Sequence, residues 1–259
     1  MQHWIRLASA LAIATLSFAA QAADEVKLKK LTSVESCYKG CSYSASFEVL
    51  VANLGYQKQV DVHVQKADGN WIDVPLNYAR PASNGQEIWS GNIPYPQNLT
   101  LTAKQIHFAL KYQVNGQTYW DNNNWANYNL DKNVGTVLFG DLVNNASPDA
   151  ERYLATGSGE FYGAVTVKNL APTKQIEVKY STDGWQTSKS AWATFNPVYW
   201  SSAYSTAANP NGYGYETWNF KLDVGNATQV EYAIGYTVNG QTYWDNNYGR
   251  NYFTRIVRY

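Results

Sequence analysis

The chain contains the same ten-residue segment twice, and this repetition constrains its architecture more than any other feature. Residues 114–123 read VNGQTYWDNN, and residues 238–247 read the same ten letters. In both copies three variable residues and an Asn-Tyr pair follow, at Asn127-Tyr128 and Asn251-Tyr252. Similarity that recurs at a long interval indicates tandem copies of one structural unit. We therefore expect two homologous modules.

The similarity between the halves extends upstream of the decapeptide. A chain of 259 residues can hold two domains of ordinary size. We predict a first module over residues 23–131 and a second over residues 132–259, which carries an insertion between Asn196 and Tyr215. The polar residues 129–135 are the expected linker, and so short a linker places the modules close together.

The local sequence pattern is that of β-strands. Residues 60–64 (VDVHV) and 176–180 (IEVKY) alternate between apolar and polar side chains. Clusters of Asn, Gly, Asp and Pro separate such short runs, which is typical of a β-sandwich. We expect an all-β chain, with at most a short turn of helix over residues 147–155.

The decapeptide also predicts which side chains face the core. An Asn-Gly pair between two β runs is the strongest short signal for a two-residue hairpin, and Asn115-Gly116 has this form. The hairpin would place Tyr112 opposite Tyr119, and directly opposite residues point to the same face. Tyr112 continues the apolar alternation of Phe108 and Leu110, so this face is the inward one.

The Trp that follows is expected to point outward, because successive side chains of a strand alternate between faces. Trp120 would lie opposite Lys111, and Trp244 opposite Gly235. The apolar face of a sugar ring can lie against an indole, and Asn amides can pair with its hydroxyls as donors and acceptors. Either the two Trp side chains bind a sugar, or the partner module or a loop covers them.

The N-terminus is typical of a signal peptide over residues 1–22. Arg6 precedes an apolar stretch, and Ala20-Gln21-Ala22 fits a cleavage site, so an exported mature chain (secreted or periplasmic) would begin near Ala23. A membrane anchor is the alternative, but the stretch is shorter than the about 20 residues of a span. Export would place Cys37 and Cys41 in an oxidising compartment, where we expect a disulfide between them.

Charge and cysteine spacing argue against several other partners. The chain has 20 basic and 20 acidic residues, which disfavours nucleic acid, because such binding relies on a basic surface. Metal binding is the alternative to the disulfide, but no His or third Cys accompanies the two cysteines. We expect neither a metal site nor a cofactor, and no membrane span.

Taken together, the motifs resemble the family 21 carbohydrate-binding modules, which include starch-binding modules of fungal glucoamylases and glycogen-binding domains of protein phosphatase 1 regulatory subunits. The resemblance rests on an N-L-x-x-x-K segment, a D-G-x-W or D-G-W turn and, most specifically, the YWDNN-x3-NY element. It covers nearly all of both modules. It implies two tandem immunoglobulin-like antiparallel β-sandwiches that bind an α-glucan such as starch, glycogen or a maltooligosaccharide.

The resemblance also implies the residues of a main site in each module. Some starch-binding members carry a Tyr where this chain has Ala109 and Ala233, so one contact of that type of site is missing. The implied site consists of the Trp after the Asp-Gly turn, the Trp before Asp-Asn-Asn and two Asn residues: Trp71, Trp120, Asn122 and Asn127 in the first module, and Trp185, Trp244, Asn246 and Asn251 in the second.

A second site is implied on the N-L-x-x-x-K segment. In the first module it would use Tyr56, Lys58 and Tyr78. In the second module it would use Lys174 and Phe195, and Pro172 stands where the stacking aromatic belongs, so this site should be weak or absent there.

An enzyme is the main functional alternative, because several carboxylates recur in both halves: Asp121 and Asp245, and Glu87 and Glu216. A glycosidase needs two carboxylates that flank one bond, and two small modules without a cleft-forming domain are a poor host for them. We expect the two Asp residues to accept backbone N–H bonds of the Asn-rich turn instead.

We therefore predict an exported, non-catalytic α-glucan-binding protein whose two modules act by avidity. The alternatives are a surface adhesion or scaffold protein that binds another glycan or a protein, and, third, a glycoside hydrolase. A separate amylolytic enzyme is a candidate partner.

Overall fold

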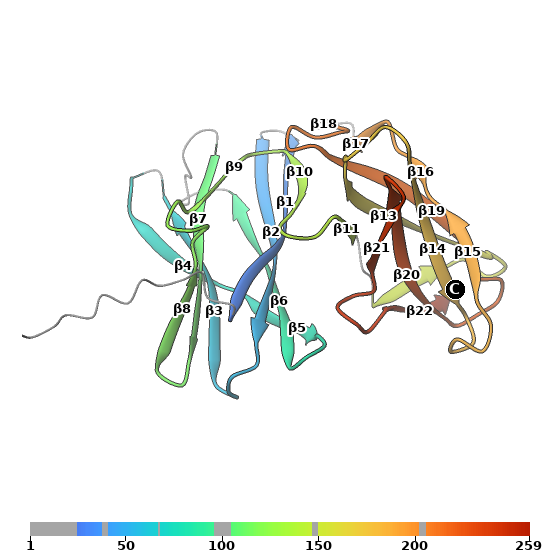
Figure 1. Ribbon diagram of the computed structural model, residues 1–259, viewed down its shortest axis with the longest axis horizontal. Coiled ribbons are helices and arrows are strands. Elements are labelled where there is room, and N and C mark those ends of the chain that lie inside the picture. Colours follow the sequence, from blue (N-terminus) through green and yellow to red (C-terminus); the bar gives the residue numbers. More distant parts are fainter. Residues whose placement is uncertain (1–24, 38–40, 67, 96–104, 147–149, 202–205) are drawn as a thin grey trace, which may run out of the picture.

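The computed structural model describes residues 25–37, 41–66, 68–95, 105–146, 150–201 and 206–259, which form two β-sandwiches side by side with no helix among them (Figure 1). The all-β prediction is therefore confirmed. No helix in this part of the chain is long and apolar enough to cross a membrane. The predicted signal peptide and its cleavage site near Ala22 and Ala23 lie outside the described residues.

The first sandwich packs two sheets over one core. Alternation in β3 buries Val60, Val62 and Val64 completely, and they join apolar side chains of the facing sheet in this core. Burial of such apolar surface is the main favourable contribution to folding. One sheet has the order β10 (Gly135–Leu138), β1 (Val26–Cys37), β2 (Cys41–Ala52), β6 (Gln86–Tyr95) and β5 (Asn77–Pro81); the other has β4 (Trp71–Pro75), β3 (Lys58–Gln65), β7 (Gln105–Val114) and β8 (Gln117–Asp121), with β9 (Tyr128–Asp131) also on β7.

The second sandwich repeats this arrangement around its own core, in which Ile176 and Val178 of one sheet meet Val165 and Val167 of the other. A separate hairpin of β17 (Val198–Ser201) and β18 (Thr206–Ala208) lies in the predicted insertion. One sheet has the order β11 (Val143–Asn145), β13 (Glu160–Lys168), β19 (Tyr215–Asp223) and β16 (Thr194–Phe195); the other has β12 (Glu151–Leu154), β22 (Tyr252–Arg258), β20 (Gln229–Val238), β14 (Lys174–Ser181) and β15 (Lys189–Trp192), with β21 (Gln241–Asp245) also on β20.

The hairpin predicted from the decapeptide is present in both modules. In the first module Tyr112 lies opposite Tyr119 and Lys111 lies opposite Trp120. In the second module Gly235 lies opposite Trp244. Phe108, Leu110 and Tyr112 are buried, as predicted for the inward face.

The path between the modules differs from the prediction. Most of the expected linker, residues 129–135, is structured, because β9 pairs with β7 and β10 pairs with β1. The chain therefore passes between the sandwiches at residues 139–142, later than the predicted boundary after residue 131. The turn of helix expected over residues 147–155 is wrong for its described part, because Glu151–Leu154 form a strand that pairs in parallel with β22.

The hairpin of β1 and β2 brings the backbones of the two cysteines opposite each other, Cys37 to Cys41. Their side chains lie outside the described residues. The disulfide between them stays a prediction.

The insertion of the second module packs against the first module. The Asn211 side chain donates to the carbonyl oxygen of Thr136 (2.8 Å), and the Tyr215 hydroxyl donates to that of Leu138 (2.6 Å). The Tyr215 ring belongs to the core of the first sandwich. The insertion therefore contributes to the interface between the two sandwiches.

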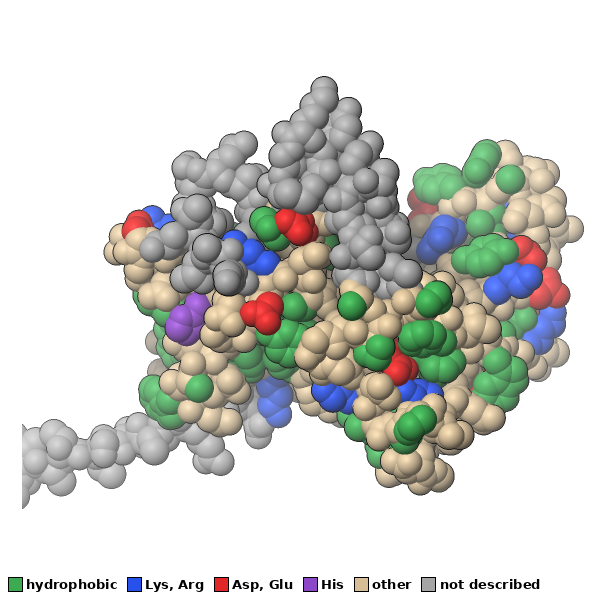
Figure 2. All heavy atoms as spheres, turned by 90° about the horizontal axis from the view of Figure 1, so that it is seen from above, with side chains coloured by type: hydrophobic (Ala, Val, Ile, Leu, Met, Phe, Trp, Pro, Cys, Tyr) green, Lys and Arg blue, Asp and Glu red, His purple; other side chains and the backbone are tan. Residues whose placement is uncertain are grey.

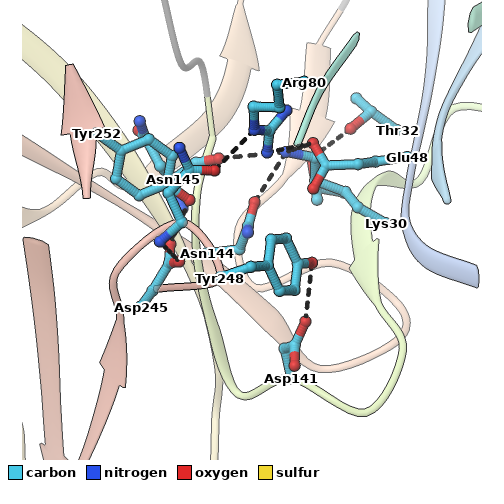
Figure 3. A network of polar contacts seen from close by, with 12 residues as sticks. Lys30, Thr32, Glu48, Arg80, Asp141, Asn144, Asn145, Asp245, Tyr248 and Tyr252 are labelled. Carbon is cyan, nitrogen blue, oxygen red and sulfur yellow. Dashed lines mark hydrogen bonds and ion pairs between the residues drawn. The ribbon is translucent and has the colours of Figure 1, made fainter. Parts of the chain in front are cut away.

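A polar network forms a second contact between the modules, and Figure 3 shows it from close by. Lys30 of β1 donates to Asn144 of β11 (2.8 Å), and Arg80 of β5 donates to Asn247 (2.7 Å). Both cations lie 3.5 Å from the buried carboxylate of Glu48. The expectation that the modules are close neighbours is confirmed by these contacts.

Candidate carbohydrate-binding sites

The second module presents an open indole on its outer face. Trp244 on β21 lies opposite Gly235 on β20, and its side chain is 52% exposed. A Cβ placed on Gly235 would meet three atoms of the indole at 3.2–3.3 Å, so the ring lies directly over this glycine. Because residue 235 has no side chain, the indole rests on the sheet with one face toward the solvent.

The Trp of the Asp-Gly turn, Trp185, is fixed by hydrogen bonds at both ends. Its backbone has a positive φ of 66° and its N–H donates to Ser181 Oγ (2.9 Å), while its Nε1 donates to Glu231 Oε2 (2.8 Å). Asp183 holds the turn by accepting the backbone N–H of Thr187. This hydrogen bond is the main reason why the pKa of Asp183 falls to about 2. A Trp in the left-handed region is uncommon and persists only where such bonds hold it.

The first module fills the equivalent surface with aromatic contacts. The rings of His63 and Trp71 stack at 4.8 Å with planes 10° apart, and the His63 ring meets Trp120 edge-on at 5.2 Å. Trp71 also meets His107 at 5.4 Å. The structure thus brings the two predicted Trp residues of this module together through His63, which the prediction did not include.

Charged side chains surround this aromatic group. Lys111, opposite Trp120, lies 5.9 Å from the centre of its indole and pairs with Asp73 (2.6 Å), which also hydrogen-bonds to His63 (2.5 Å). Burial alone raises the pKa of Asp73, but the hydrogen bonds from Lys111 and His63 more than offset it and lower the pKa. Trp120 is half-buried as a result, unlike its exposed counterpart Trp244.

The four predicted Asn residues shape the turn that follows each Trp. Asn122 and Asn246 accept backbone N–H groups three residues on, at Trp125 (3.0 Å) and Gly249 (2.9 Å). Asn127 and Asn251 have positive φ angles of 55° and 54°. Each donates its backbone N–H to the carbonyl oxygen of the Asn at the start of the turn. These residues therefore have a structural role in addition to the one expected from the resemblance.

The recurring carboxylates of Asp121 and Asp245 hold the turns, as expected, and also join them to neighbouring strands. Asp121 accepts hydrogen bonds from the backbone N–H of Leu28 (2.8 Å) and from the hydroxyl of Tyr128. Asp245 likewise accepts from the backbone N–H of Asn145 (2.7 Å) and from the hydroxyl of Tyr252 (2.7 Å). Burial raises the pKa of Asp245 to about 6, although these hydrogen bonds oppose the shift.

The other pair of recurring carboxylates forms a salt bridge in each module. Glu87 accepts from Lys58 (2.8 Å) and from the indole of Trp89 (3.0 Å). Glu216 accepts from Lys174 (2.8 Å) and from the indole of Trp218 in the same way. Both predicted Lys residues of the second site are therefore engaged in a repeated Lys-Glu-Trp group.

Two of the aromatic residues predicted for the second site, Tyr78 and Phe195, contact the Trp of this group. Tyr56 is fully exposed, and Tyr78 meets Trp89 at 6.2 Å. In the second module Phe195 meets Trp218 in the same edge-on manner at 5.6 Å. An open groove of about 570 Å³ lies there, and Pro172, Lys174, Phe195 and Trp218 are among the residues that line it.

A further hollow, of about 480 Å³, borders Trp244. Thr242, Trp244 and Asn246 line one side, and the segment 140–143 that connects the modules lines the other. Acidic and basic side chains are interspersed on the face that Figure 2 shows, without a large field of one sign. The hollow beside Trp244 is lined by the indole, by hydroxyl and amide groups and by the carboxylates of Asp141 and Asp245, and a sugar can use such apolar and hydrogen-bonding groups.

Comparison with known proteins identifies the sequence family. The model of the carbohydrate/starch-binding module (family 21) matches residues 22–131 and 150–255. Protein phosphatase 1 regulatory subunit 3B of Homo sapiens is 33% identical over 100 residues, which are 37% of this chain and 31% of that protein. Glucoamylase 1 of Rhizopus oryzae is 32% identical over 113 residues, which are 43% of this chain and 17% of that protein.

Solved structures include similar domains. The starch-binding domain of Rhizopus oryzae glucoamylase, solved in complex with β-cyclodextrin and maltoheptaose, has 28% sequence identity and a TM-score of 0.31, over 42% of this chain and 95% of that one. The chain spans less than half the length of the two curated relatives. Two matches to the family model together cover more than half of the sequence. The chain belongs to the family 21 carbohydrate-binding modules.

Proposed function

We propose that this protein is an exported, non-catalytic α-glucan-binding protein whose two modules hold one polymer by avidity. The observation that carries the proposal is the exposed indole of Trp244, which lies over Gly235 beside the Asn-rich turn. An aromatic plane flanked by amides matches the apolar face and the hydroxyl rim of a glucosyl unit. Membership of the carbohydrate/starch-binding family, and the similarity to a glucoamylase, support an α-linked glucan as the ligand class.

Avidity follows from two modules in one chain. A polymer offers many equivalent sites, so the second module binds at a high effective concentration once the first is bound, which raises affinity by roughly 10²–10⁴. The interface at Lys30, Arg80 and the insertion supports this proposal, because it keeps the modules adjacent. A separate amylolytic enzyme acting on the same polymer is a candidate partner.

Co-sedimentation of the full chain with insoluble starch tests the binding proposal. We expect retention of the parent protein, weaker retention after Trp120→Ala or Trp244→Ala, and none after both, with an unchanged circular dichroism spectrum. Absence of retention of the correctly folded parent chain would contradict the proposal and favour an adhesion or scaffold role.

Release of reducing sugar from soluble starch tests the non-catalytic part. We expect no release above buffer by the parent chain or by Asp121→Ala. Release by the parent that Asp121→Ala removes would identify a glycoside hydrolase instead.

A further inference from the structure

A second exposed indole shares a row of outward side chains with Trp244. Trp192 is the last residue of β15 and lies opposite Glu177 on β14. Glu177 lies opposite Gly235 on β20, and Gly235 lies opposite Trp244 on β21. Directly opposite residues point to the same face of a sheet. Trp192 and Trp244 therefore stand on one face, three strand spacings or about 14 Å apart.

Both indoles are open to solvent, and nothing bulky stands between them on this row. The Trp192 side chain is 59% exposed, and the residues that separate it from Trp244 are Glu177 and Gly235. Glu177 is held by the hydroxyl of Ser190, which donates to its Oε1 (2.5 Å). The row thus consists of an indole, a fixed carboxylate acceptor, a bare glycine and a second indole.

We propose that Trp192 is a second stacking residue for the glucan chain that lies on Trp244, so that the site of the second module crosses four strands and takes several consecutive glucosyl units. This inference rests on the proposed function. Each indole would cover the apolar face of one sugar ring, and Glu177 would accept hydroxyl hydrogens of the units between them. The occupant is a glucan because the row is continuous with the site that the family resemblance assigns to Trp244.

The first module lacks this extension. Its equivalent row runs from Pro75 on β4 through Asp61 and Lys111 to Trp120. Pro75 offers no indole, and Asp61 is completely buried and bonded to Gln59. The longer site is therefore a property of the second module alone, and it predicts a dependence on ligand length that the first module does not share.

Calorimetric titration of the full chain with maltose and with maltoheptaose tests the proposal in a Trp120→Ala background, which removes the indole of the first module's main site. Maltose is too short to reach both indoles. We expect Trp192→Ala to weaken maltoheptaose binding about tenfold and to leave maltose binding unchanged. The control is Tyr162→Ala, which removes an exposed aromatic from β13 on the other sheet and should change neither affinity.

Equal affinities of Trp192→Ala and its parent for maltoheptaose would overturn the extension while leaving the proposed function intact. Absence of binding by the parent itself would contradict both. The reverse graft, Pro75→Trp in a Trp244→Ala background, tests the same idea by adding an indole to the first module: we expect tighter maltoheptaose binding, and no gain there would also count against the extension.

Discussion

The two copies of the decapeptide have the same sequence and the same hairpin, but they present their Trp differently. Trp120 lies beside His63 and opposite Lys111, and these neighbours leave it half-buried. Trp244 lies over Gly235 and stays exposed. The comparison shows that the local sequence determines the direction of the ring, whereas the residues beside it on neighbouring strands determine how much of the ring is exposed.

The turns that follow the two Trp residues diverge further. In the first module the turn exposes Trp125, whose side chain is 69% accessible. In the second module the equivalent turn enters the interface, where Tyr248 packs against Leu50, Ala82 and Ile88. One copy of the turn thus faces solvent, and the other joins the sandwiches.

The largest expected effect concerns this use of the turn. Tyr248→Ala removes a ring from a buried contact, and we expect it to lower the free energy of unfolding by about 3 kcal/mol. Its matched control is Asn124→Ala, at the equivalent exposed position with the same φ of 55°. In urea unfolding, the control should lose no more than about 1 kcal/mol of the free energy of unfolding. Similar losses for both variants would mean that the interface adds little stability.

A smaller effect is expected from exchanging the residues opposite the Trp. Gly235→Lys in a Trp120→Ala background crowds the indole, because even its Cβ approaches the ring to 3.2 Å. We expect maltoheptaose affinity to fall about tenfold, or about 1.4 kcal/mol. The reverse change, Lys111→Gly in a Trp244→Ala background, should improve binding a few-fold. Unchanged affinity in both titrations would show that the opposite residue does not control the site.

The smallest effect concerns pH. The pKa of Asp245 is about 6 in the folded chain and near 3.8 when unfolded, so the folded state binds its proton more tightly. The stability that this proton contributes is fully present below pH 4 and is lost as pH rises through 6. Between pH 5 and pH 7 the parent should lose about 1 kcal/mol from this group. Asp245→Asn should flatten that part of the profile, and a profile identical to the parent's would contradict the assignment.

Short-range features of the fold could be predicted from the sequence. Asn115-Gly116 and the alternation before it determined the hairpin, the inward Tyr112 and the outward Trp120, because all of these depend on neighbours in the chain. The strands within residues 129–135 could not be predicted, because they pair with β7 and β1, and polar composition does not reveal such distant partners.

The same dependence on distant partners explains why the sequence did not reveal two residues near the site, His63 and Trp192. The pairing of β3 with β7 places His63 beside Trp120, and the pairing of β14 with β15 places Trp192 in the row of Trp244. The first of these pairings is not a hairpin, so no turn determines its register. Outward alternation in VDVHV was a signal that His63 is on the outer face, but not that it meets Trp71.

We expect the second module to carry the more accessible glucan site. The most direct test is to titrate the full-length Trp120→Ala and Trp244→Ala variants with maltoheptaose under identical conditions. We expect the dissociation constant of Trp120→Ala to stay within about twofold of the parent's tighter site, and that of Trp244→Ala to rise about tenfold, or about 1.4 kcal/mol. Equal losses in the two variants, or a larger loss in Trp120→Ala, would contradict the claim.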